Sequence, residues 1–347
     1  MNETPPDSTA SGIRAQPFAP TADPAFYFAA QAHNACLQRI RAGIDAREGV
    51  AVVLGGYGTG KTMLLRELAA ELARSPSKYC VAVLGAPMPS WSSFELLEAI
   101  VVQFGLDPGP KTFVAYMDAL NRFLIGNRDR VVTLLVDDAQ NLNKRGQLEM
   151  LRLAQNLEDA QHKLLNIVLF AQLDWTAVLK AAPGFAQCIT ASQVLEPFPS
   201  AEVKPFIEHR LKKAGASTGA PTFDDGAIAM IQAYAEGNPR RIVTLCRNAL
   251  ALAEQSNTRR IGQPIVLQAI ESVSLLEPER KERATVAALL AANPQSTALN
   301  NPAVGAAKPT VPAGAALATA PAAKSLNKDK KANEMLLRAA RARQSSS

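Results

Sequence analysis

The chain has 347 residues, of which 48% are hydrophobic and 5% are aromatic. This length allows more than one folded unit, and the dominance of Ala and Leu favours a helix-rich α/β protein over a β-sandwich. The four cysteines lack CxxC or Cys/His spacing, which argues against a zinc site or a disulfide framework and indicates a reducing compartment. No uncharged apolar stretch reaches the roughly 18 residues of a membrane span, and the N-terminus lacks the apolar region of a signal peptide. The sequence therefore predicts a soluble, cytoplasmic protein.

The net charge of +6 is concentrated towards the C-terminal end. The segment from Lys324 to Arg343 contains seven basic residues and only two acidic ones, and Lys308 adds one more positive charge. The rest of the chain is therefore formally neutral, so the basic signal belongs to the tail alone. We predict an Ala/Pro-rich linker over residues 285–323 and a basic tail over residues 324–347.

Residues 1–20 are polar and proline-rich, and are predicted to form a disordered arm. Residues 21–199 alternate apolar strands with amphipathic helices, which predicts an α/β domain with a parallel sheet covered by helices on both faces. The expected strands are 50–54, 79–84, 131–136, 165–171 and 189–195. The expected helices are 33–46, the run from the end of the glycine loop to about 74, 94–104, 113–125 and 147–159.

After Pro199 the strand patterns stop. Four helical patterns follow, at 201–214, 224–236, 239–255 and 263–273. They predict a separate all-helical domain over residues 200–284.

A glycine-rich loop carries the strongest chemical signal. Residues 55–62 read GGYGTGKT and fit G-x-x-x-x-G-K-[ST], with a strand before the loop and a helix after it. Glycines let the backbone wrap closely around a phosphate, and the helix N-terminus adds its positive dipole end. Lys61 would bind the β- and γ-phosphates of ATP, and the Thr62 hydroxyl would coordinate Mg²⁺. This loop predicts the P-loop NTPase fold.

The nucleotide site is expected to extend beyond the phosphates. His33 would flank the adenine together with Phe26 or Tyr27, or would serve a structural role near an N-terminal helix. The residues predicted to contact the nucleotide are Gly55, Gly56, Tyr57, Gly58, Thr59, Gly60, Lys61, Thr62, Met63 and His33.

An acidic pair closes the third expected strand. Asp137 would hold the Mg²⁺ shell, and Asp138 would polarise the attacking water. Glutamate is common at the second position, and aspartate sets its carboxylate back by about 1 Å, which is enough to slow in-line attack. A solvated acidic strand end is the alternative interpretation of the pair.

Two further residues are predicted to sense the phosphates. Gln172 follows the fourth strand and would face the γ-phosphate, unless it is an ordinary strand-end turn residue. Arg240 lies at a helix start beside Pro239 and would reach the phosphates from the helical domain, or would be a surface cap.

Several of these segments resemble the ExeA/GspA-type AAA+ ATPases, a family associated with bacterial secretion and pilus assembly. The resemblance runs from about Pro17 to Glu271. Beyond the glycine loop, the segments that carry it are DPAFYF at 23–28, LVDDAQNL at 135–142, LEMLRL at 148–153, IVLFAQ at 167–172 and GNPRRI at 237–242. It implies an AAA+ nucleotide-binding domain followed by a helical lid, an oligomeric ATPase, and ATP with Mg²⁺ as cofactors. Related DNA-transposition ATPases share much of this plan.

The chain departs from the family pattern at three points. Asp138 replaces the usual glutamate, and Cys188 and Ser192 stand where the resemblance implies arginines that act across a subunit interface. Losing such an arginine removes several kcal/mol of transition-state stabilisation. Secretion-type members also continue into a membrane span and a periplasmic region, whereas a linker and basic tail follow the lid here.

Three functions are therefore open. The chain could be a motor or switch that serves an envelope or pilus machine, a DNA-binding transposition-type ATPase, or a nucleotide-binding scaffold that hydrolyses slowly or not at all. The expected partners are further copies of the chain and a protein of an envelope or DNA-transaction machine. The basic tail could also dock on nucleic acid, an acidic partner or an anionic membrane, or remain a solubilising end.

Overall fold

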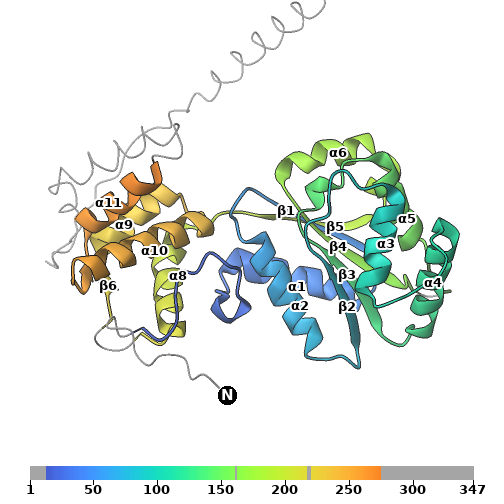
Figure 1. Cartoon of the computed structure of the whole chain (residues 1–347), viewed down its shortest axis with the longest axis horizontal. Helices are drawn as coiled ribbons and strands as arrows, with labels where there is room; N and C mark the ends of the chain where they lie inside the picture. The colour runs from blue at the N-terminus through green and yellow to red at the C-terminus, as the bar shows by residue number, and fades with distance from the viewer. Residues whose placement is uncertain (1–12, 161, 217–219, 275–347) are drawn as a thin grey trace, which may run out of the picture. The chain divides into compact units, whose positions relative to one another are not determined.

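The computed structural model describes residues 13–160, 162–216 and 220–274 (Figure 1). All of these residues lie within the first of the two units into which the chain divides, Met1–Pro294. The predicted linker and basic tail fall outside the described residues. Within the described part, no helix combines the length and apolarity needed to cross a bilayer.

A parallel sheet forms the centre of the first domain, as predicted. Its spatial order is β2-β3-β4-β1-β5, so the strand that leads into the glycine loop is flanked on both sides. The strands are β1 Val50–Gly55, β2 Tyr79–Leu84, β3 Val131–Val136, β4 Leu165–Ala171 and β5 Ile189–Leu195. Leu54 of β1 lies opposite Ala171 of β4, and Val136 of β3 lies opposite Leu169. The segments that follow β1, β3 and β4 therefore start at one edge of the sheet.

Helices cover both faces of this sheet because successive side chains of its buried strands point to opposite sides. On β4, Ile167 and Leu169 pack in one core cluster, whereas Val168 and Phe170 pack in another. The first cluster is covered by α3 Ser93–Gln103, α4 Phe113–Gly126 and α5 Arg145–Gln155. The second is covered by α1 Gln31–Asp45 and α2 Lys61–Ala73.

Several local elements differ from the sequence predictions. Helix α5 ends at Gln155 rather than at residue 159, because the chain turns back and Leu164 N–H donates to the Leu157 carbonyl at 3.1 Å. Helices α6 Thr176–Ala181 and α7 Pro183–Ala186 had no predicted counterpart, since both are too short to show a periodic pattern. The 3₁₀ turns, also unpredicted, are η1 Pro24–Phe26, η2 Ala139–Asn141 and η3 Leu173–Trp175.

The second domain is helical, as predicted, with one small addition. Its helices are α8 Ser200–Lys213, α9 Asp225–Ala235, α10 Pro239–Gln255 and α11 Gln263–Ser274. The strands β6 Thr222–Phe223 and β7 Arg260–Ile261 form a two-stranded parallel ladder between them. Two residues are too few to produce a strand pattern, which is why the sequence did not reveal the ladder.

Part of the predicted disordered arm is ordered in the structure. Phe18 is fully buried, and its ring meets Phe223 edge to face at 6.1 Å. The buried Arg210 donates from Nε to the Pro17 carbonyl at 2.7 Å. Burying one Phe side chain contributes about 2 kcal/mol to the free energy of unfolding. The hydrogen bond to Pro17 offsets part of the cost of burying the Arg210 guanidinium. Because residues 1–20 are polar and proline-rich, their composition did not predict that Phe18 would be buried.

A backbone contact fixes the segment that leads from the sheet to the helical domain. Phe198 N–H donates to the Gly237 carbonyl at 2.9 Å, so the approach to α8 lies against the turn between α9 and α10. Gly237 has φ +72°, and a Cβ atom there would lie 1.9 Å from the Phe198 carbonyl oxygen. Glycine is therefore required at this position for its conformation and for the close approach of two backbones.

We expect Gly237→Ala to lower the free energy of unfolding by about 3 kcal/mol or more, because strain and a backbone clash act together. Gly109→Ala is the matched control: Gly109 has a similar φ of +75°, but a Cβ atom there would meet nothing within 4 Å. The control should cost only about 1 kcal/mol. Urea unfolding of both variants tests this, and equal losses would show that the contact with Phe198 is unimportant.

Candidate functional site

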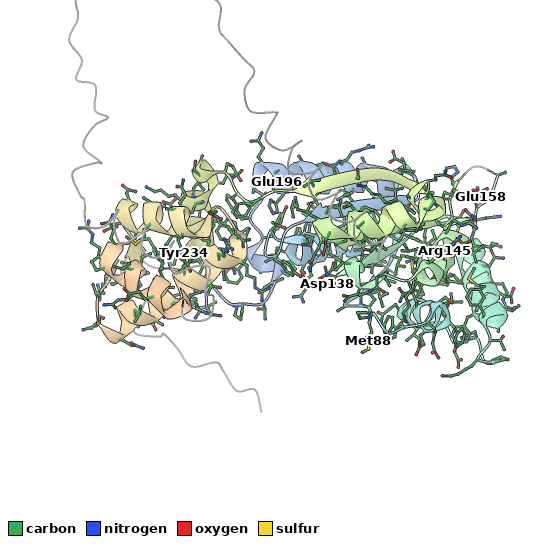
Figure 2. The ribbon with its side chains drawn as sticks, turned by 90° about the horizontal axis from the view of Figure 1, so that it is seen from above. Met88, Asp138, Arg145, Glu158, Glu196 and Tyr234 are labelled. Carbon is green, nitrogen blue, oxygen red and sulfur yellow. The ribbon has the colours of Figure 1, made fainter. Side chains whose placement is uncertain are left out.

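The predicted site residues follow three neighbouring strands. The glycine loop comes after β1, Asp137 and Asp138 come after β3, and Gln172 comes after β4. Because these strands are parallel and end at the same edge of the sheet, the structure brings the three segments together. Figure 2 shows Asp138 at this place in the α/β domain.

The glycine loop has the backbone of a phosphate cradle. Gly58 and Gly60 adopt φ values of +76° and +100°, a conformation that other residues rarely adopt. Gly60 is the N-cap of α2, and no side chain caps that helix end. The first N–H groups of α2 therefore lack a side-chain acceptor, and with the helix dipole they favour an anion. This loop fits the phosphates of a nucleotide.

Lys61 lies inside the loop. Its Nζ donates to the carbonyls of Gly55 and Gly56, each at 2.8 Å, and the residue is only 8% exposed. Burial lowers the pKa of the ammonium, while Asp138, Asp137 and Asp174 act in the opposite direction. The positive charge is therefore held at the loop by carbonyl oxygens and nearby carboxylates.

Asp137 and Thr62 form a pair of oxygen donors. The Thr62 hydroxyl lies near enough to the Asp137 carboxylate to lower its pKa. Burial raises the pKa of Asp137, and the Thr62 hydroxyl and the hydrogen bond from Asp138 N–H partly oppose that shift. A hydroxyl and a carboxylate beside a phosphate cradle are ligands that Mg²⁺ accepts. These two residues therefore fit a magnesium ion bound together with a nucleotide.

The Asp138 carboxylate belongs to a hydrogen-bonded chain that the sequence did not reveal. Asp138 has a left-handed backbone, with φ 47° and ψ 41°. Gln140 Nε2 donates to Asp138 Oδ1 at 2.9 Å, and Gln140 Oε1 accepts from Gln172 N–H at 3.2 Å. Gln172 thus joins the site through its backbone amide. Gln140 lies in the family-like segment at 135–142, yet composition and spacing gave it no role.

His33 contacts the backbone of the glycine loop. Its Nε2 is 2.7 Å from the Thr59 carbonyl oxygen, and its ring meets Phe198 edge to face at 5.0 Å. A carbonyl only accepts, so Nε2 carries the proton, and the buried Nδ1 has no hydrogen-bond partner in the described structure. Burial lowers the pKa of the imidazole and favours its neutral form. This contact supports the loop backbone, which fits the structural role that the sequence left open beside an adenine contact.

The helical domain contacts the glycine loop through the start of α10. Asn238 Oδ1 accepts from the N–H groups of Arg240 and Arg241, and its Nδ2 donates to the Tyr57 carbonyl at 2.7 Å. Arg240 N–H also lies 3.2 Å from the Gly58 carbonyl oxygen. The exposed Arg240 side chain lines a cavity of about 370 Å³ together with Tyr57 and Gly58. Asn238, to which the sequence gave no function, therefore caps α10 and binds the loop at once.

Cys188 and Ser192 belong to the β5 region, on the edge strand beside β1. Cys188 is half-buried just before β5, and Ser192 lies on β5 opposite Val52. Neither side chain can supply the positive charge that the family resemblance implies at these positions.

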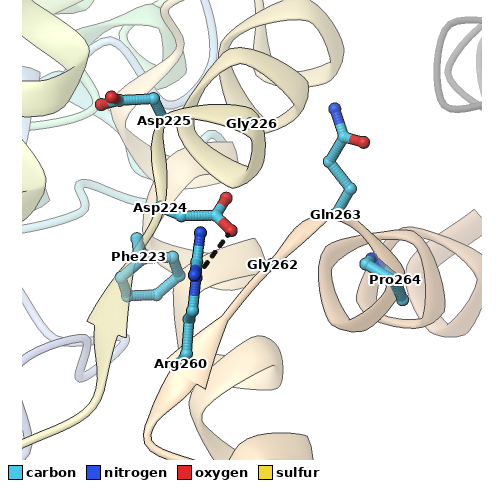
Figure 3. A pocket seen from close by; sticks show the side chains of 8 residues that line it. All are labelled: Phe223, Asp224, Asp225, Gly226, Arg260, Gly262, Gln263 and Pro264. Carbon is cyan, nitrogen blue, oxygen red and sulfur yellow. Dashed lines mark hydrogen bonds and ion pairs between the residues drawn. The ribbon is translucent and has the colours of Figure 1, made fainter. Parts of the chain in front are cut away.

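A larger hollow of about 580 Å³ lies elsewhere, at the β6–β7 ladder and the starts of α9 and α11 (Figure 3). Arg260 Nε pairs there with Asp224 Oδ2 at 3.3 Å, and Asp224 also caps α9 through Ala227 N–H. Arg260 and Asp224 neutralise each other as an ion pair. Despite its larger volume, this hollow is therefore a weaker candidate site than the glycine loop.

Comparisons with known proteins agree with this geometry. Residues 44–179 match the family model described as AAA domain. General secretion pathway protein A from Aeromonas hydrophila is 31% identical over 275 residues, covering 77% of this chain and 48% of that protein. The chain therefore spans about half the length of this relative.

Two solved structures share the fold. Cdc6p from Pyrobaculum aerophilum has a TM-score of 0.59 and 19% identity, covering 74% of this chain and 70% of that one. The ORC1 protein of Aeropyrum pernix, solved in complex with DNA, has a TM-score of 0.57 and 19% identity, covering 77% and 71%. At such low identity these likenesses show the fold alone.

The strand order and the glycine loop define a P-loop NTPase. Residues 44–179 therefore carry an AAA domain, and the predicted resemblance to the ExeA/GspA-type AAA+ ATPases is confirmed.

We expect Asn238→Ser to weaken ATP binding about fivefold, the value of one hydrogen bond of about 1 kcal/mol. Serine still caps α10 but cannot reach the Tyr57 carbonyl, so the free energy of unfolding should fall by no more than about 1 kcal/mol, the value of that one bond. Asn238→Ala should lose the cap as well and cost about 1 kcal/mol more. Titration with a fluorescent ATP analogue and urea unfolding measure the two effects. Unchanged affinity in the serine variant would show that the contact with Tyr57 does not support the loop.

Proposed function

We propose that this chain binds ATP with Mg²⁺ and hydrolyses it as a nucleotide-dependent motor or switch of the ExeA/GspA type. The observation that carries the proposal is the buried Lys61 ammonium, which donates to the Gly55 and Gly56 carbonyls in a loop where Gly58 and Gly60 have positive φ. A buried cation beside unfilled helix N–H groups favours a phosphate over other small ligands.

Each residue has a distinct part in the proposed reaction. The loop N–H groups and Lys61 bind the phosphates, and Thr62 and Asp137 hold the metal ion, which neutralises charge on the phosphates. Asp138 orients and polarises the attacking water. Gln172 and Arg240 are proposed to lie beside the γ-phosphate and to respond to its loss. The end of α10 that carries Arg240 touches the loop, so a change at the phosphates has a direct route to the helical domain.

The cellular role is proposed from the secretion-protein relative. We place the chain in an envelope or pilus assembly process on the cytoplasmic side, working as a homo-oligomer with a protein partner. Oligomerisation would let another subunit or the partner supply the arginine that Cys188 and Ser192 do not provide.

A slow or non-hydrolysing scaffold is the second candidate. Asp138 in place of glutamate, together with Cys188 and Ser192, favours it. Both candidates bind ATP in the same cradle, and they differ only in turnover.

Lys61→Ala should abolish ATP turnover and weaken ATP binding at least tenfold, because the loop loses its only buried ammonium among the described residues. Lys180→Ala, which removes an exposed lysine from α6, should leave both unchanged. Steady-state turnover at several protein concentrations is the measurement, and a rate per subunit that rises with concentration supports an oligomer. Equal ATP binding by the Lys61 variant and the native protein would contradict the proposed site.

Asp138→Glu should raise kcat about tenfold with little change in ATP affinity, since the extra methylene returns the carboxylate to reach of the attacking water. Asp138→Asn keeps the size of the side chain but removes the charge, and should lower kcat. If the glutamate variant were no faster than the native protein, the short carboxylate would not be what limits hydrolysis.

A further inference from the structure

Gln140 uses both ends of its side-chain amide. The Nε2 group donates to Asp138 Oδ1 at 2.9 Å, and Oε1 accepts from the backbone N–H of Gln172 at 3.2 Å. An amide offers donor and acceptor in one rigid plane, so this side chain bridges the acidic pair after β3 and the end of β4. It is half-buried, which limits competition from water for the two bonds.

We propose that Gln140 is a positioning residue that fixes the Asp138 carboxylate for water activation by anchoring it to the end of β4. The proposal rests on the proposed ATPase function, because Asp138 needs a fixed position only if it acts on a bound nucleotide.

Asp138 needs such an anchor because a nearby cation competes for it. The Lys61 ammonium is held in the same site and attracts the Asp138 carboxylate. If the Asp138 carboxylate formed an ion pair with Lys61, it would compete with the phosphates for the ammonium. It would also point away from the attacking water. The hydrogen bond from Gln140 holds Oδ1 on the β4 side and leaves Oδ2 for the water.

The backbone at Asp138 limits other ways to hold the side chain. With φ 47° and ψ 41°, Asp138 leaves β3 in a left-handed turn, and its N–H is already bonded to Asp137 Oδ1 at 3.0 Å. The side chain is also one methylene shorter than glutamate, so a small rotation moves its oxygens out of range. The external bond from Gln140 therefore sets the direction of the carboxylate.

The other end of the bridge is rigid. Besides the Gln140–Gln172 bond, the buried Trp175 donates from Nε1 to the Leu142 carbonyl at 3.0 Å. Two hydrogen bonds thus tie η2 to the segment that follows β4, and Phe170 and Ala171 at the end of that strand are fully buried. A fixed anchor point is what a positioning residue requires.

Two substitutions separate the two bonds. Gln140→Leu removes both, whereas Gln140→Glu keeps an acceptor for Gln172 N–H and loses the donor to Asp138. Asn143→Ala is the matched control, because it changes an exposed amide just beyond the same turn. We expect both Gln140 variants to lower kcat for ATP at least tenfold with KM unchanged, and the control to match the native protein.

A double-mutant cycle tests whether Gln140 acts through Asp138. In an Asp138→Ala background, Gln140→Leu should lower kcat no further, while thermal unfolding and binding of a fluorescent ATP analogue report whether each variant is folded. Native-like kcat in Gln140→Glu, or a full further loss in the Asp138→Ala background, would overturn the proposal. If the native protein shows no ATP turnover, the ATPase proposal is wrong, and so is the proposed role of Gln140, which depends on it. Native turnover that Gln140→Leu leaves unchanged refutes the role of Gln140 alone.

Discussion

A buried ammonium is the constraint on which the rest of the site depends. Lys61 is 8% exposed, and a cation can stay charged there only if other groups replace the water that it lost. Two loop carbonyls bind it directly, and three aspartates act on it from nearby segments. The loop must fold back on itself to present those carbonyls, which requires the left-handed glycines, and the aspartates must come from the segments after β3 and β4.

Because the loop must keep its shape, contacts from other elements bind its backbone carbonyls. The helical domain makes two of these contacts, at Tyr57 and Gly58. Two side chains bind the loop backbone, the His33 imidazole at the Thr59 carbonyl and Asn238 Nδ2 at the Tyr57 carbonyl. Phe198 links these supports, since its ring touches His33 and its N–H binds Gly237, just before Asn238. A loop held from both domains can transmit a change in its own geometry to α10.

The sequence predicted those parts of the protein that depend on periodicity and on local motifs. Buried strands such as Val131–Val136 are continuous apolar runs, and the glycine loop combines its pattern with the correct flanking elements. Contacts between residues far apart in the chain leave no such pattern. Gln140 meets Gln172, and Phe18 meets Phe223, only after the fold has formed. For His33 the sequence left an adenine contact and a structural role open, because spacing indicates proximity to the loop and not the atom that the imidazole binds.

Charge around the cradle bears on how binding and hydrolysis could be separated. Burial lowers the pKa of the Lys61 ammonium and three carboxylates oppose that shift, so its charge is partly balanced before a polyphosphate binds. Binding would then depend also on the α2 N-terminus and on the metal ion that Thr62 and Asp137 fit. In the transition state the negative charge on the transferring phosphate is redistributed over its oxygens and the leaving oxygen, and a further cation lowers the energy of that state. Arg240 is a cation of the helical domain that lines the cavity at the loop, while Cys188 and Ser192 are neutral. A cradle built in this way would hold ATP in the isolated chain and hydrolyse it quickly only when a neighbouring subunit or partner adds positive charge.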